Sequence, residues 1–165
     1  MSTFNRVLFI SGLALLIGVG AYFYSSTTSP TFTQEIHQLT ERLEVGVKYT
    51  EAENDKVYML PYVKNPNNEE LTFTHQPNFI EVQMLNTNGE VVEDALYLKD
   101  KEEENTIHST RLEPGERYVQ NNYYVIDLST EAISLQLSYD GQIDDEFGYV
   151  DYQEDVAINI QHLGL

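Results

Sequence analysis

The chain of 165 residues contains no cysteine and no tryptophan. Without cysteine it can form no disulfide, even in an oxidising compartment, and it cannot be attached to a membrane through a lipid-modified N-terminal cysteine. A catalytic thiol is excluded for the same reason. The stability of the folded part must therefore come from an ordinary hydrophobic core.

Basic residues are scarce. The sequence has 9 Lys and Arg residues against 27 Asp and Glu residues, which gives a formal net charge of −18, and no Lys or Arg follows Arg117. Nucleic acids and anionic lipid surfaces are recognised by basic surfaces, so the composition argues against both as partners. It favours a cationic partner or a divalent cation. A hydrated acidic surface that serves solubility or adaptation to salt is the alternative.

Recognisable catalytic motifs are also missing. The sequence has no G-x-S-x-G nucleophile elbow, no S-x-x-K and no H-E-x-x-H. Histidines 37, 75, 108 and 162 are scattered, which leaves open only a zinc site assembled from distant histidines. So many acidic residues could be paired as glycosidase carboxylates that no single pair is informative. We therefore expect that the protein is not an enzyme.

One long uncharged run stands near the N-terminus. It begins at Val7, directly after Arg6, and ends at Tyr24. As a helix it would reach about 27 Å, close to the roughly 30 Å of the hydrocarbon layer. The aromatic residues 22–24 suit the lipid–water interface, and the single basic residue before the run favours a cytoplasmic N-terminus. We predict that residues 1–24 anchor the protein as a transmembrane helix.

Two alternatives to the anchor are a cleaved signal peptide and a buried core helix. A signal peptide usually has a shorter apolar region and a small-residue cleavage site, whereas bulky aromatic residues occupy the end of this run. The pattern therefore favours an uncleaved anchor in the cell membrane over secretion after cleavage. Residues 25–42, rich in Ser and Thr at their start, are expected to form a linker, with residues 35–42 either continuing it or making two helical turns.

The remaining residues, 43–165, are expected to form one extracytoplasmic domain built from β-strands. Apolar and polar residues alternate in 43–49, 80–84, 133–139 and 156–160, which places one face of each strand in a core. Further strands are expected at 57–64, 71–74, 91–98, 107–112 and 117–126. Turns are expected at 65–68, 86–89, 113–116 and 140–141. This spacing predicts an antiparallel, immunoglobulin-like β-sandwich of 7–9 strands, with Pro61 on an edge or at a bulge.

Part of this pattern resembles a known family. The resemblance rests on the segment 62–73 with its Asn65-led turn and its final Phe73, followed by Ile80-Glu81-Val82, the turn at Asn88-Gly89, and Leu112-Glu113-Pro114-Gly115-Glu116. This order resembles the bacterial intracellular proteinase inhibitor family over about residues 57–127. The resemblance implies a small β-sandwich and an inhibitor-like interaction with a protein. No inhibitory contact residue is carried over, because no segment of this chain matches a reactive segment.

A cluster of carboxylates suggests a possible metal site near the C-terminus. In SYDGQIDDEFGYVDYQED the acidic residues crowd what the pattern presents as a loop between two strands. Calcium is bound by six to eight oxygens, mainly from carboxylates and backbone carbonyls. The spacing differs from that of the helix–loop–helix calcium loop. The candidate calcium ligands are Asp140, Asp144, Asp145, Glu146 and Asp151.

These observations predict a membrane-anchored module of the bacterial cell envelope that works by binding. The first hypothesis is a protein-interaction module, in the manner of the inhibitor-like family, that displays loops or an edge strand to an unidentified partner. The second is a structural or sensing domain that binds calcium or another cation. Apart from this calcium, no cofactor is expected.

Overall fold

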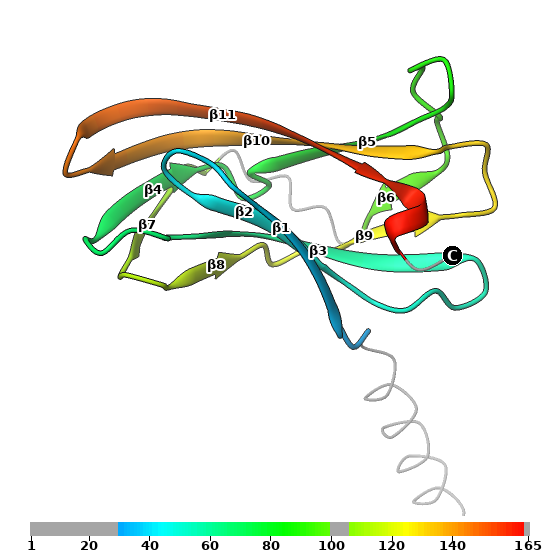
Figure 1. Ribbon diagram of the computed structural model, residues 1–165, viewed down its shortest axis with the longest axis horizontal. Helices are drawn as coiled ribbons and strands as arrows, with labels where there is room; N and C mark the ends of the chain where they lie inside the picture. The colour runs from blue at the N-terminus through cyan, green and yellow to red at the C-terminus, as the bar shows by residue number, and fades with distance from the viewer. Residues whose placement is uncertain (1–29, 100–105, 164–165) are drawn as a thin grey trace, which may run out of the picture. The chain divides into compact units, whose positions relative to one another are not determined.

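The computed structural model describes residues 30–99 and 106–163 (Figure 1). The predicted anchor and most of the predicted linker lie outside these residues. The elements described below belong to one unit, Phe32–Leu165; the separate unit Met1–Thr31 is described only at its last two residues. Within the described part of the chain, no helix is both long enough and apolar enough to span a membrane.

The described chain folds into two antiparallel sheets, as the β-sandwich prediction requires. The first sheet has the order β1 (Gln34–Leu39), β2 (Glu44–Tyr49), β3 (Lys56–Lys64), β9 (Tyr124–Asp127) and β6 (Leu96–Leu98), with β8 (Arg117–Val119) also paired to β3. The second has the order β11 (Gly148–Asn159), β10 (Ser134–Asp145), β4 (Leu71–His75) and β7 (His108–Leu112), with β5 (Ile80–Leu85) also paired to β10. A short 3₁₀ helix, η1 (Ile160–Leu163), follows β11.

The core is built from the inward faces of both sheets. Val45, Val47 and Tyr49 alternate with more polar neighbours along β2, and their side chains are buried. Leu135, Leu137 and Tyr139 do the same along β10. The predicted alternation is therefore confirmed at these positions, although Ile133, which begins the second pattern, is exposed. Alternation succeeds here because successive side chains of a strand point to opposite faces.

Two long strands each pair with two shorter ones on the same side. In β3, Lys56–Met59 pair with β9 and Tyr62–Lys64 pair with β8, so Pro61 lies where the partner changes. The N–H and C=O of a strand residue point to the same neighbour, and the Pro61 carbonyl accepts from Gln120 N–H at 2.9 Å. The N–H that proline lacks would thus point to the gap between β9 and β8, where β3 can do without a donor. β3 is a central strand, which corrects the prediction of an edge position for Pro61.

The described residues form eleven strands, more than the 7–9 expected, and of the predicted strand at 91–98 only Leu96–Leu98 is formed, as β6. Three further local predictions were wrong, each for an identifiable reason. Gln34–Leu39 form β1, not a linker or helical turns, because they pair with β2 along their whole length. Residues 117–126 form two strands, since the chain leaves β3 at Gln120 and returns at Tyr124. The expected turn at 140–141 lies inside β10. There, a Cβ on Gly141 would come within 2.5 Å of the Phe73 ring, so glycine serves close packing and not a turn.

His75, at the end of β4, is packed in an aromatic cluster. Its ring stacks on Phe73 at a centroid distance of 4.9 Å and contacts Phe79 and Tyr118 at 5.2 and 4.6 Å, while His108 stacks at 5.9 Å. Only 3% of the residue is exposed, and this burial lowers its pKa. Hydrogen bonding to the Gln76 carbonyl opposes this lowering without cancelling it. Histidine 75 therefore resists protonation in the folded state.

This burial predicts a loss of stability in mild acid. In the unfolded chain His75 takes up a proton near pH 6.5, whereas in the folded protein it does so only at lower pH. The free energy that the neutral, buried ring contributes to folding is therefore complete above pH 6.5 and decreases as the pH falls below that value. We expect the thermal midpoint to fall between pH 7.5 and 5.5, and to fall less steeply in His75→Gln. His108 stacks against the His75 ring and also lowers its pKa, so His108→Gln should flatten the slope as well, but less than His75→Gln does. Equal slopes in wild type and His75→Gln would contradict the prediction.

Candidate functional site

The predicted calcium ligands lie on a long hairpin formed by β10 and β11, which replaces the expected loop. Asp140, Asp144 and Asp145 are in β10, Glu146 is in the turn, and Asp151 is in β11 opposite Gln142. By alternation, Asp140 and Asp144 point to the opposite face of the sheet from Asp145. The hairpin thus divides the five carboxylates between two faces and the turn, so it does not gather all five on one side.

Asp145 already has a cationic partner. A single guanidinium nitrogen of Arg42, in the turn between β1 and β2, donates to its two carboxylate oxygens at 2.5 and 2.6 Å. The Asp145 side chain is only 4% exposed. On the other face, Gln142 donates from Nε2 to Asp151 at 3.0 Å. Calcium binding by these residues stays a prediction. Ion pairing with Arg42 now gives Asp145 a structural role that the sequence did not reveal.

The tip of this hairpin exposes apolar side chains. Phe147 is 71% exposed and Tyr149 is 63% exposed, and Val150 beside them is partly exposed. The Arg42 guanidinium lies 5.2 Å from the centroid of the Phe147 ring, and Asp145 accepts a hydrogen bond from the Phe147 N–H at 2.8 Å. Arg42 therefore lies against the exposed ring, and Asp145 fixes the backbone that carries it. We call Arg42, Asp145, Phe147 and Tyr149 the hairpin tip.

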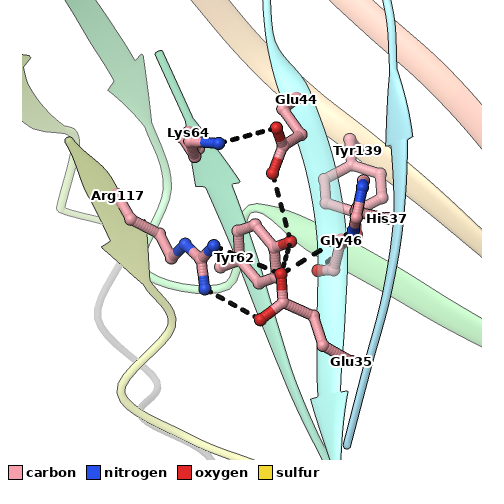
Figure 2. Close-up of polar contacts among 8 residues, drawn as sticks. All are labelled: Glu35, His37, Glu44, Gly46, Tyr62, Lys64, Arg117 and Tyr139. Atoms are coloured by element: carbon pink, nitrogen blue, oxygen red, sulfur yellow. Dashed lines mark hydrogen bonds and ion pairs between the residues drawn. The ribbon is translucent and has the colours of Figure 1, made fainter. Parts of the chain in front are cut away.

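A second polar site lies on the outer face of the first sheet, where Tyr62 crosses Gly46 (Figure 2). Tyr62 of β3 pairs with Gly46 of β2, and a Cβ on that glycine would lie 2.5 Å from the Tyr62 ring. The missing side chain lets the ring reach β1, where its hydroxyl donates to Glu35 at 2.6 Å. From β8, the Arg117 guanidinium stacks 4.2 Å from the centroid of the same ring. Four strands are thus joined through one tyrosine.

Glu35 is the most heavily bonded carboxylate of this site. Two nitrogens of Arg117 donate to its two oxygens at 3.0 and 3.2 Å, in addition to the bond from Tyr62. Burial alone would raise the pKa of Glu35, but the hydrogen bonds from Tyr62 and Arg117 outweigh it and lower the pKa. Burial and the bond to Glu35 raise the pKa of Tyr62 well above its usual value. The site therefore holds an anionic carboxylate and a neutral phenol at neutral pH.

Glu44 and His37 complete the second site. Lys64 donates to Glu44 at 2.8 Å, and the Tyr62 hydroxyl lies 3.4 Å from the other Glu44 oxygen. His37 Nδ1 is 3.8 Å from Glu35. One ligand atom each from Glu35, His37 and Glu44 lies within 4.8 Å of the others, a grouping that includes none of the predicted calcium ligands. The sequence did not indicate this site, because Glu35 and His37 fall within the predicted linker. The signal that could have found them is their i, i+2 spacing.

No protein-family model and no curated protein matches the sequence. Similar solved structures include the GAE domain of yeast GGA1, with 10% identity over 76% of this chain and 98% of that one, at a TM-score of 0.48. The GAE domain of GGA2p from Saccharomyces cerevisiae has 6% identity over 76% and 97%, at 0.45. A DUF1425 family member from Shewanella sp. pv-4 has 13% identity over 66% and 90%, at 0.28. Likenesses of this degree assign no function.

Proposed function

We propose that this β-sandwich is a protein-binding module and that the hairpin tip is its contact surface. The observation that carries the proposal is the exposure of Phe147 and Tyr149 on a support that Arg42 and Asp145 fix. Aromatic residues and arginine dominate the binding energy of protein interfaces. A ring that is already held in place loses little conformational entropy when a partner covers it.

The charges around the tip indicate the chemistry of the partner. Asp144 is paired with Tyr149, Glu146 precedes Phe147, and Asp151 follows Tyr149 by two residues on β11, while Arg42, the basic residue of the tip, is engaged with Asp145. A partner with an apolar pocket and a basic rim would complement this surface. Such complementarity would mainly raise the rate of association and exclude acidic competitors. This agrees with the cationic partner that the net charge favours.

The cellular setting is part of the same proposal. Residues 7–24 would anchor the chain in the cell membrane, and the domain would face outward in the bacterial cell envelope without enzymatic activity. The length and aromatic end of the apolar run support the anchor. The motifs that resemble the proteinase inhibitor family, at about residues 57–127, support an interaction with a protein. They also support an immunoglobulin-like arrangement of the sandwich. A tether of this kind would keep the binding domain at the membrane, within reach of membrane proteins.

Site-specific photocrosslinking in intact cells tests the contact surface. A photoreactive amino acid is placed in the full-length chain at position 147, 149 or 97. Tyr97 is the matched control, because it is also an exposed aromatic residue but belongs to β6, a strand well removed from the tip of the β10–β11 hairpin (Figure 1). We expect one discrete adduct from positions 147 and 149 and none from 97. The absence of adducts at the tip, or equal adducts at all three positions, would refute the proposal.

The captured partner then allows a quantitative measurement with purified proteins. Phe147→Ala is expected to weaken its binding by about 2 kcal/mol, or roughly 30-fold, as is typical of a central aromatic contact. Tyr97→Ala should leave the affinity within twofold. Because Phe147 is largely exposed, its replacement should not unfold the domain, so a loss of affinity reports a lost contact.

A further inference from the structure

We propose that Glu35, His37 and Glu44 bind a divalent transition-metal ion of the Zn²⁺ class. Their ligand atoms are mutually within 4.8 Å, on one face of two neighbouring strands. The grouping combines an imidazole with two carboxylates, which distinguishes it from an ordinary cluster of surface acids. Zinc is commonly bound by histidine nitrogen and by Asp or Glu oxygen. This site is separate from the hairpin tip and from the predicted calcium ligands.

The pairing of β1 with β2 creates the arrangement. Glu35 and His37 are two residues apart on β1, so their side chains share the outer face. His37 is paired with Gly46, and Glu44 is two residues away from that glycine on β2. His37, Gly46 and Tyr62 are paired side by side across β1, β2 and β3. Since Gly46 has no side chain, no side chain of β2 separates His37 from the Tyr62 hydroxyl. Figure 2 shows both carboxylates directed toward that hydroxyl.

Both carboxylates are held in position by hydrogen bonds from neighbouring residues, as the ligands of protein metal sites usually are. Residues that hydrogen-bond to a metal ligand fix its position and tune its affinity. Tyr62 and Arg117 hold Glu35, and Lys64 holds Glu44. A carboxylate has about four lone-pair sites, so each glutamate keeps capacity for an ion beside these bonds. The Tyr62 side chain that donates here is fully buried, which makes this support rigid.

The donor set also selects the class of ion. Calcium and magnesium prefer oxygen ligands alone, whereas imidazole suits zinc, copper, nickel and iron. The positive charges of Arg117 and Lys64 already balance the two carboxylates, so charge attraction alone is a weak source of affinity here. The imidazole of His37 therefore has to supply the decisive bond. Its replacement is the sharpest test.

The test is a Zn²⁺ titration of the full-length chain, at pH 7.5, by calorimetry and by thermal unfolding. We expect Zn²⁺ to bind with a stoichiometry of one and to raise the thermal midpoint. His37→Ala and Glu44→Gln should each weaken Zn²⁺ binding at least tenfold and remove most of the rise. His108→Ala is the matched control, because His108 is also an exposed histidine on a strand, and it should leave the affinity within twofold.

Co²⁺ provides an independent readout, because bound Co²⁺ gives a visible absorption band that should appear in wild type and disappear in His37→Ala. Thermal midpoints without metal show that the variants are folded, as expected for an exposed histidine. The absence of Zn²⁺ binding to wild type would overturn the proposal. Equal Zn²⁺ affinity in wild type and His37→Ala, or an equal loss in His108→Ala, would also overturn it.

Discussion

Phe73→Ala is expected to lower the free energy of unfolding by about 3–5 kcal/mol, the range found when a buried phenylalanine is truncated. The side chain is fully buried. Its ring contacts Phe79 edge-on at 5.6 Å and stacks on His75, and it fills the space that Gly141 leaves on β10. Since domains of this size are stabilised by roughly 5–15 kcal/mol, the variant would lose a large share of its stability.

Urea unfolding of the purified chain measures this effect, and Phe147→Ala is a control of the same chemistry. Both variants remove the same atoms, but Phe147 is exposed at the hairpin tip and makes few contacts to lose. We expect its free energy of unfolding to change by less than about 0.5 kcal/mol, as for most surface substitutions. The pair thus separates folding from binding: Phe73→Ala should lose stability, and Phe147→Ala should lose the partner. Similar stabilities of the two variants would show that Phe73 is not a core residue.

Gly46→Ala is expected to cost about 1–3 kcal/mol of stability, as overpacking of a well-filled site usually does. The added methyl group would lie 2.5 Å from the Tyr62 ring, so the ring must move. This movement would disturb its 2.6 Å hydrogen bond to Glu35 and its contact with the Arg117 guanidinium. The methyl group would therefore weaken the attachment of β1 to the rest of the sheet.

A double-mutant cycle with Tyr62→Ala tests that mechanism. If the cost of Gly46→Ala comes from the collision with the Tyr62 ring, the same substitution should cost far less when the ring is absent. We expect a coupling energy of at least about 1 kcal/mol, within the range for residues in contact. Equilibrium unfolding of the four proteins provides the measurement. Additive effects would show that the glycine is needed for another reason.

The sequence predicted the strands that have one buried face. Val45 and Val47 on β2, and Leu135 and Leu137 on β10, alternate with polar residues because one side of each strand is in the core. Strand β1 escaped prediction because Ile36 is its one residue that packs against the core, and the other five positions carry no apolar alternation. The extension of β10 and β11 beyond residue 140 escaped for a different reason, since the glycines and clustered carboxylates of 140–151 suggested a loop, although Ile143 and Tyr152 are buried in the core.

The two candidate sites differ in how far the sequence could indicate them. The carboxylates near the C-terminus were visible as a local cluster, but their division between two faces depends on the hairpin register. The second site was invisible as a unit, because Glu35 and Arg117 are separated by 82 positions in the chain. Likewise, 103 positions separate Arg42 from Asp145. Local patterns carry no information about contacts at such separations.

By itself, the sequence determined an all-β fold without disulfides, the positions of most strands and turns, and a strongly acidic surface. These properties follow from local composition and from the two-residue period of a strand. Only the tertiary structure decided that Gly46 gives Tyr62 a path to Glu35, and that Arg42 holds the hairpin tip. The reason is physical: such contacts arise from the pairing order and register of strands that are distant in the chain, and many pairings satisfy the same alternation.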